Sequence, residues 1–236
     1  MNSCFRKLVL LTLVMVLILS GCGKTPDVPA QLGTGTEADS SRFAVIDIRD
    51  YGKMKFRLLA EQAPNAVDAF VKLAEEGFYD EKPVYMLIKD YCMISGADSQ
   101  STLEVSEDAG LTEKCYPLRG SLAFTQAVGS DKYSASNFMV IQTGTEFLDK
   151  LEELLKYKKV TLPEYLKQGY GNEIDEAAVG IYKKYGGAPW LYRHCIVFGQ
   201  LSEGEDVLDK ICSVEVFDDA QFRPMEDIVI NSITIE

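Results

Sequence analysis

From residue 43 onward the chain consists of short segments in which apolar and polar residues alternate, and this alternation limits the folds open to it. Residues 43–49 and 53–59 alternate in steps of two on either side of Tyr51 and Gly52, which predicts a β-hairpin. Many short strands with few helices favour a mainly β fold, in which a barrel has helices over its ends. The further strands are predicted at residues 84–88, 92–94, 122–125, 138–142, 196–200 and 228–235.

Two helices interrupt the strands, and a longer helical stretch breaks their rhythm. Residues 63–77 have apolar positions at helical spacing, Pro64 in the first turn and Gly77 at the end. A second, short helix is predicted at 207–211. Between about 145 and 185 the pattern predicts a helical insert in a barrel loop, which either flanks a site or is a neutral decoration. Its helices are expected at 147–158, 162–168 and 174–185.

The N-terminus carries the features of an export signal. Arg6 and Lys7 precede an almost unbroken apolar run at residues 8–19, a length typical of a signal peptide and too short to span a bilayer. Leu19-Ser20-Gly21-Cys22 resembles the bacterial lipoprotein box, which implies cleavage before Cys22 and lipidation of its thiol, palmitate included. An ordinary secretory signal that happens to contain Cys22 is the alternative. We therefore expect a signal peptide at 1–21, a flexible linker at 22–41 and a domain at 42–236, lipid-anchored outside the cytoplasm at the bacterial cell membrane.

The charge and the cysteines exclude some functions. A formal net charge of −12 disfavours nucleic acid and anionic headgroups, so membrane contact is expected through the lipid anchor only. No cofactor is indicated, and a zinc site is weakly signalled, because no C-x-x-C is present and only His194 could add an imidazole. We expect a monomer. Export permits disulfides, but the sequence leaves their pairing open among Cys92, Cys115, Cys195 and Cys212.

Five segments together resemble a known family. Residues 63–80, 88–98, 119–124, 134–140 and 186–211 are similar, in order, to motifs of the cyclophilins, which are peptidyl-prolyl cis–trans isomerases. The resemblance runs from about residue 43 to residue 236. It implies a closed eight-stranded antiparallel barrel capped by two helices.

The same resemblance implies a diverged catalytic site. The family's arginine, which stabilises the twisted prolyl amide, falls on Met86, and the family's histidine falls on Cys195, or on His194 after a slip of one residue. Arg193 is the best substitute cation, and Lys89 and Arg119 are less well placed. The proline floor stays apolar, with Trp190 at its rim and Tyr91 or Cys92 at the family's phenylalanine position. The residues expected to bind substrate are Met93, Ser95, Phe124, Thr125, Gln126, Asn137, Met139, Trp190 and Leu191.

Two functions follow from this resemblance. One is an isomerase for X-Pro bonds of exported, proline-containing polypeptides, weak because Met86 has no hydrogen-bond donor. The other is a lipoprotein on the same fold that binds proline peptides or a partner without catalysis. A structural protein of the cell envelope that kept only the fold is a third possibility.

Overall fold

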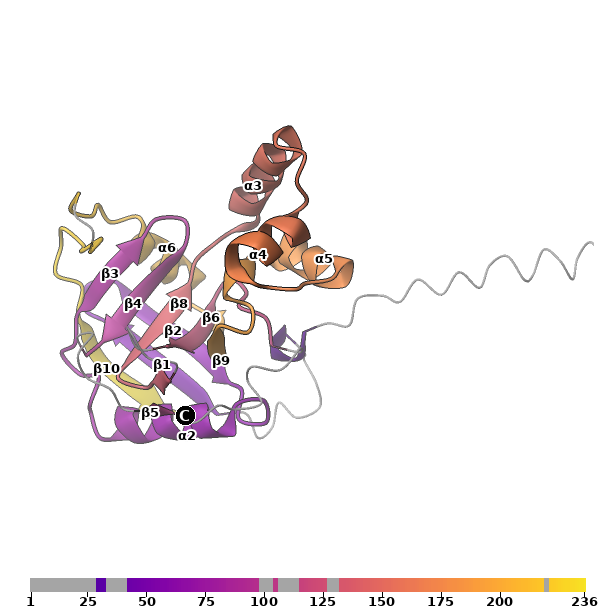
Figure 1. Cartoon of the computed structure of the whole chain (residues 1–236). Coiled ribbons are helices and arrows are strands. Elements are labelled where there is room, and N and C mark those ends of the chain that lie inside the picture. The colour runs from indigo at the N-terminus through magenta and orange to yellow at the C-terminus, as the bar shows by residue number, and fades with distance from the viewer. Residues whose placement is uncertain (1–28, 33–41, 98–103, 106–114, 127–131, 219–220) are drawn as a thin grey trace, which may run out of the picture.

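The strands form one curled antiparallel sheet. The computed structural model describes residues 29–32, 42–97, 104–105, 115–126, 132–218 and 221–236. In Figure 1 the sheet occupies one side of the molecule, and its strand order is β10-β1-β2-β9-β6-β8-β4-β3. Its members are β1 (Phe43–Ile48), β2 (Gly52–Leu58), β3 (Val84–Ile88), β4 (Cys92–Gly96), β6 (Ser121–Thr125), β8 (Asn137–Ile141), β9 (Cys195–Glu203) and β10 (Ile230–Ile235); β5 (Glu104–Val105) pairs separately with β7 (Tyr133–Ser134).

The mainly β, eight-stranded fold is confirmed, but the expectation of a closed barrel is wrong. The outer strands β3 and β10 form no ladder, and only the bridge between Pro83 and Val229 joins the two edges. Three backbone hydrogen bonds lie at this bridge: from the Val84 amide to the Ile228 carbonyl (2.8 Å), from the Ile230 amide to the Lys82 carbonyl (2.9 Å) and from the Glu81 amide to the Ile230 carbonyl (2.8 Å). The sheet is therefore a half-barrel with a short seam.

Two helices cover the ends of the sheet. They are α2 (Pro64–Glu75) and α6 (Glu205–Cys212), and Figure 1 shows α2 below the strands and α6 above them. Helix α2 inserts Phe70 among rings on the inner face of the sheet, 5.1 Å from Phe198 and 5.4 Å from Tyr79, centroid to centroid. Each such buried side chain contributes about 1.5–3 kcal/mol, so this aromatic core anchors the helix.

The predicted insert is helical and has a small core of its own. It comprises α3 (Thr145–Tyr157), α4 (Leu162–Tyr170) and α5 (Glu176–Tyr185), and it projects from one end of the sheet in Figure 1. A capping box of Thr161 and Glu164 begins α4, and Gly171 ends it in the left-handed conformation. The insert core contains Leu155, Leu162, Leu166, Ile174, Ala178, Val179 and Tyr192. Among the described residues no helix is long and apolar enough to cross a bilayer.

Part of the expected linker packs against the sheet instead. A single 3₁₀ turn, η1 (Ala30–Leu32), follows buried Pro29 and places Gln31 in the interior. The linker prediction therefore fails for these residues. The rest of the predicted linker and signal peptide, including Cys22, lies outside the described residues.

Candidate functional site

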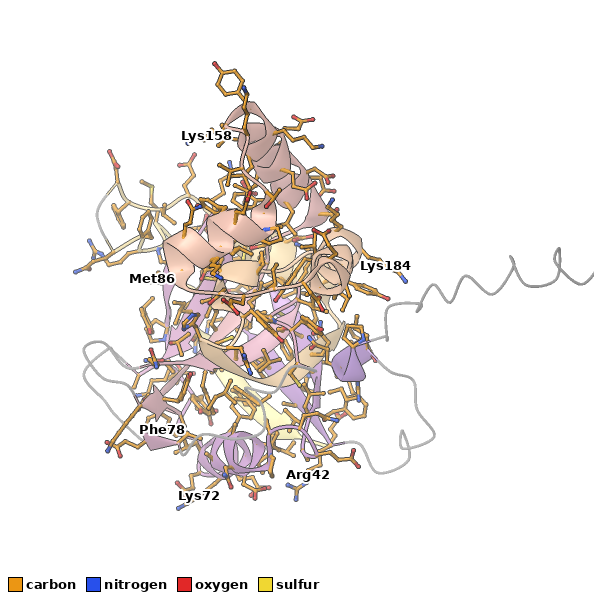
Figure 2. All side chains as sticks on the ribbon, turned by 45° about the vertical axis from the view of Figure 1, so that its right-hand side comes forward. Arg42, Lys72, Phe78, Met86, Lys158 and Lys184 are labelled. Atoms are coloured by element: carbon orange, nitrogen blue, oxygen red, sulfur yellow. The ribbon has the colours of Figure 1, made fainter. Side chains whose placement is uncertain are left out.

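The outer face of the sheet carries one row of side chains that matches the predicted site. Antiparallel partners point to the same face, and the pairings Met86–Ile94, Ile94–Met139 and Met139–Ala123 align these residues across β3, β4, β8 and β6. Met86 is half-buried at the start of this row. In Figure 2 it lies at the side of the sheet, below the tip of the insert at Lys158 and above α2 at Lys72.

An apolar cluster lies on this face under the loop that carries the only tryptophan. The loop contains the 3₁₀ turn η4 (Pro189–Leu191). We call the group the Trp190 cluster; it consists of buried Cys92, Met139, Ile141 and Ala188 with half-buried Ile88, Tyr91, Ile94, Trp190 and Leu191. Its floor is apolar and buried and its rim is partly exposed, as a receptor for a proline ring requires.

Two predicted site residues on β4 face the other way. Met93 is fully buried in the main core, and the Ser95 hydroxyl donates to the Pro83 carbonyl at 2.9 Å. Cys92 and Ile94 take their places on the outer face. Residues 88–98 resemble the cyclophilin motif with one extra residue, and a shift of one position on a strand moves every side chain to the opposite face. The alternation of β4 with β8 is the signal that could have chosen the register.

The remaining predicted contacts divide between core and surface. Phe124 is fully buried against Phe198, 4.2 Å between centroids, so its side chain does not reach the outer face. Thr125 and Asn137 are half-buried and lie on the same face as Met139. Asn137 is two positions before Met139 on β8, and Thr125 is two positions after Ala123, the partner of Met139 on β6. Gln126 is exposed beyond them. These three polar residues form one edge of the Trp190 cluster.

Aromatic rings surround Trp190. Its ring centroid is 5.4 Å from that of Tyr91 and 5.9 Å from that of Phe147 on α3, both near edge-to-face. Burial, more than the neighbouring Cys92, raises the pKa of Tyr91, so the phenol stays neutral and brings no charge to the site.

The loop of Trp190 is held from the insert side by a residue that the sequence analysis missed. Asn172 is 5% exposed, and its amide nitrogen donates to the carbonyls of Pro189 (3.0 Å) and Trp190 (2.9 Å). Its carbonyl oxygen lies 2.6 Å from His194 Nε2. His194 therefore completes a structural contact with the insert. An asparagine inside an insert carries no signal of this role in a single sequence.

The candidate replacements for catalytic groups divide as follows. Arg193 is exposed, with a φ of 64°, directly after Tyr192. Cys195 is buried, and burial followed by the influence of Cys115 raises the pKa of its thiol to about 12. Burial therefore keeps the Cys195 thiol protonated at neutral pH. Arg119 is occupied, because Nε donates to Glu205 (2.8 Å) and Nη2 to Asp209 (2.5 Å).

A cavity of about 800 Å³ lies beside the cluster, between α3 and the sheet. Phe147 and two further apolar residues of α3, Leu151 and Leu154, line it at helical spacing. Across from them Gln142 presents a buried Oε1 with no hydrogen-bond partner among the described residues. Within those same residues no group of three or more His, Cys, Asp and Glu side chains could hold a metal ion.

Comparison with known proteins agrees with the fold. The family model "Cyclophilin type peptidyl-prolyl cis-trans isomerase/CLD" matches residues 43–162 and 170–235. A curated Staphylococcus haemolyticus protein that carries the name of a peptidyl-prolyl cis-trans isomerase is 31% identical over 78% of this chain and 87% of its own length. A similarly named Staphylococcus saprophyticus protein is 29% identical, over 85% and 95% respectively.

Solved structures share the fold. A cyclophilin type peptidyl-prolyl cis-trans isomerase from Cryptosporidium parvum superposes with a TM-score of 0.55 at 18% identity, covering 83% of this chain and 98% of that one. A structure of the same protein in the presence of the dipeptide Ala-Pro gives a TM-score of 0.54 at 19% identity, covering 82% and 98%.

Proposed function

The chain belongs to the cyclophilin-type peptidyl-prolyl cis-trans isomerase family, and from this premise we propose that it binds and slowly isomerises X-Pro segments of exported polypeptides at the Trp190 cluster. The observation that carries the proposal is the continuous row Met86–Ile94–Met139, of which Ile94 and Met139 belong to the Trp190 cluster. The Ala-Pro dipeptide present with the Cryptosporidium neighbour supports a proline-containing ligand.

The apolar residues of the cluster are suited to the proline ring. Met139 and Cys92 would form the floor, and Trp190 and Leu191 the rim. The polar edge at Thr125, Gln126 and Asn137 would hold the backbone of the flanking residues. This assignment replaces Met93 and Ser95 by Cys92 and Ile94 and keeps the other predicted outer-face residues.

Turnover depends on how the site treats the twisted amide. Rotation breaks amide resonance against a barrier of about 20 kcal/mol. The family's guanidinium would stabilise the pyramidal nitrogen in the transition state, and Met86 offers no donor there. Removing water from the amide in an apolar pocket lowers the barrier by a few kcal/mol at most. Slow catalysis follows from this difference, and binding without catalysis is its limiting case.

The test is an isomerisation assay on a proline-containing peptide with the full chain in mild detergent. We expect Met86→Arg to increase the rate at least tenfold, because about 1.4 kcal/mol of added transition-state stabilisation gives that factor. Met225→Arg is the matched control, since Met225 is 50% exposed and belongs to none of the strands that carry the row. Equal rates for Met86→Arg and the wild type would contradict the role of position 86.

Two further outcomes separate the alternatives. If Arg193 substitutes for the missing guanidinium, Arg193→Ala lowers the wild-type rate, and an unchanged rate ends that idea. If the wild type binds the peptide without accelerating isomerisation, while Met86→Arg does accelerate it, the protein is a binding module on the cyclophilin fold.

We also propose that Cys22 carries a lipid and holds the domain outside the cytoplasm. The support is the sequence Leu19-Ser20-Gly21-Cys22 after a short apolar run. Two or more acyl chains anchor a protein stably, at about 0.8 kcal/mol per buried methylene. Labelled palmitate should be incorporated into the wild type and not into Cys22→Ala, which should leave the membrane fraction; membrane retention of that variant would contradict the anchor.

A further inference from the structure

The side chain of Gln31 is buried in the protein and makes hydrogen bonds with residues far away in the sequence. Its side chain is 1% exposed, and Nε2 lies 2.7 Å from the Tyr116 carbonyl, 3.1 Å from Ser121 Oγ and 3.0 Å from Gln200 Oε1. Its Oε1 accepts the Tyr116 amide at 2.7 Å. A buried amide is costly unless its donors and acceptors are satisfied, and here all are.

The residues around Gln31 are held as well. Arg57 Nη2 donates to the Gln31 carbonyl at 2.5 Å, so the backbone is fixed from β2. Leu32 packs on a cluster that joins the sheet to the insert and contains Leu118, Leu148, Ile181 and Tyr182. A four-residue segment cannot order itself, so these contacts account for its position.

Gln31 is connected to the Trp190 loop through one short segment, residues 116–118. Both backbone polar groups of Tyr116 bind Gln31, and the Tyr116 ring stacks on Tyr192 at 5.5 Å and 13°. The next carbonyl, that of Pro117, accepts the amide of Ala188 at 2.8 Å. Ala188 and Tyr192 flank η4 on either side. The segment that Gln31 fixes thus supports both ends of the turn that presents Trp190.

We propose that Gln31 is a positioning residue of the peptide-binding site, acting through residues 116–118 on the Trp190 loop. This inference rests on the proposed function for its consequence in peptide binding. It makes the functional unit begin at Pro29 rather than at residue 42. It also shortens the tether, because the seven residues from Cys22 to Pro29 span at most about 25 Å, which would keep the site near the membrane.

The test compares the full chain in mild detergent with Gln31→Ala, Gln31→Glu and the matched control Gln168→Ala, an exposed glutamine on α4. Trp190 is the only tryptophan, so intrinsic fluorescence reports on the site directly. For Gln31→Ala we expect faster hydrogen exchange at the Tyr116 amide, a shifted Trp190 emission maximum, and a proline-peptide Kd raised about fivefold. Gln31→Glu keeps an acceptor for the Tyr116 amide but turns a carboxyl oxygen toward the Tyr116 carbonyl and Gln200 Oε1, so the same readouts should change in the same direction as in Gln31→Ala.

Two results would overturn the proposal. One is unchanged Tyr116 exchange in both Gln31 variants. The other is faster exchange with Trp190 emission equal to that of the Gln168→Ala control, which would make Gln31 a local contact only. Exchange and emission need no peptide, so they decide the role of Gln31 even if the wild type fails to bind proline peptides.

Discussion

At the scale of single residues, burial determines what the cysteines can do. Cys92, Cys115, Cys195 and Cys212 are all buried thiols. Burial raises the pKa of Cys195 and of Cys212 from 9.0 to about 12, and it raises that of Cys92 as well. Burial therefore keeps the thiols of Cys92, Cys195 and Cys212 protonated at neutral pH, including the one that falls at the family's histidine position in the sequence match.

This burial predicts a loss of stability at alkaline pH. The folded thiols have raised pKa values, so the unfolded state loses its protons first, near pH 9, while the folded thiols stay protonated to about 12. The stabilisation is present below pH 9 and is lost progressively as the pH rises toward 12. We expect the urea concentration at the midpoint of unfolding to be lower at about pH 10.5 than at about pH 8.

The control for this prediction is the double variant Cys195→Ala and Cys212→Ala. Its midpoint should be lower at pH 8 because of lost packing, but it should fall less with rising pH than the wild type. A decrease of the same size in both proteins would assign the effect to other groups, such as the buried tyrosines.

At the scale of elements, α3 and η4 join the insert to the site. Helix α3 contributes only Leu148 and Leu155 as buried residues, so much of its apolar side is still available. Phe147 is 38% exposed and lies against Trp190, whereas Tyr157 at the other end of the helix is 87% exposed. The insert therefore flanks the Trp190 cluster, and its flanking of a site stays a prediction with the candidate site itself.

Phe147→Ala should separate this contact from general effects on the helix. We expect a shifted Trp190 emission, weaker proline-peptide binding and a loss of about 0.5–1.5 kcal/mol in stability, because an aromatic pair is removed. Tyr157→Ala removes an aromatic side chain from the same helix without touching Trp190. Binding and emission changes of equal size in the two variants would show that the contact with Trp190 does not matter.

At the scale of the whole molecule, the half-barrel is held least firmly at the seam between the outer strands β3 and β10. The strands from β10 through β3 form a continuous ladder, and the gap between the two outer strands is crossed by the Pro83–Val229 bridge with few hydrogen bonds. Local opening begins where few bonds resist it. The outer-face row reaches this edge of the sheet, because Met86 lies on β3, two positions after Val84.

Hydrogen exchange should detect this seam. The amides of Val84 and Ile230, which bond across it, should exchange faster than the hydrogen-bonded amides in the ladder of β6 and β8. The reason is that the seam can open without separating the aromatic core around Phe70. Equal protection at the seam and in the central ladder would mean that the barrel opens only by global unfolding.

Much of the fold could be predicted because it depends on local pattern. The strand predicted at residues 84–88 has those bounds in the structure, and the three insert helices were placed within a few residues of α3, α4 and α5. Alternation and helical spacing encode these elements directly. Closure of the barrel was overestimated, because strand patterns do not say whether the first and last edges pair.

The site could be predicted only in part. Met139, Trp190 and Leu191 come together as expected, since their positions in the motifs were unambiguous. Met93 and Ser95 were exchanged with Cys92 and Ile94 because one extra residue left two registers. Asn172 and Gln31 were missed, since a polar residue in an insert or a linker looks like a surface residue until its partners are known.

The sequence by itself determined the strand and helix pattern, the acidic character of the chain and the absence of a guanidinium at position 86. It also contains segments that resemble the cyclophilin motifs in the same order. Only the tertiary structure decided which face of β4 meets the Trp190 loop, and that Gln31 and Asn172 hold that loop from segments far away in the chain. The reason is physical. Helix and strand propensities depend on residues that are close in the sequence, whereas a buried amide is stabilised only by hydrogen-bond partners that folding brings to it.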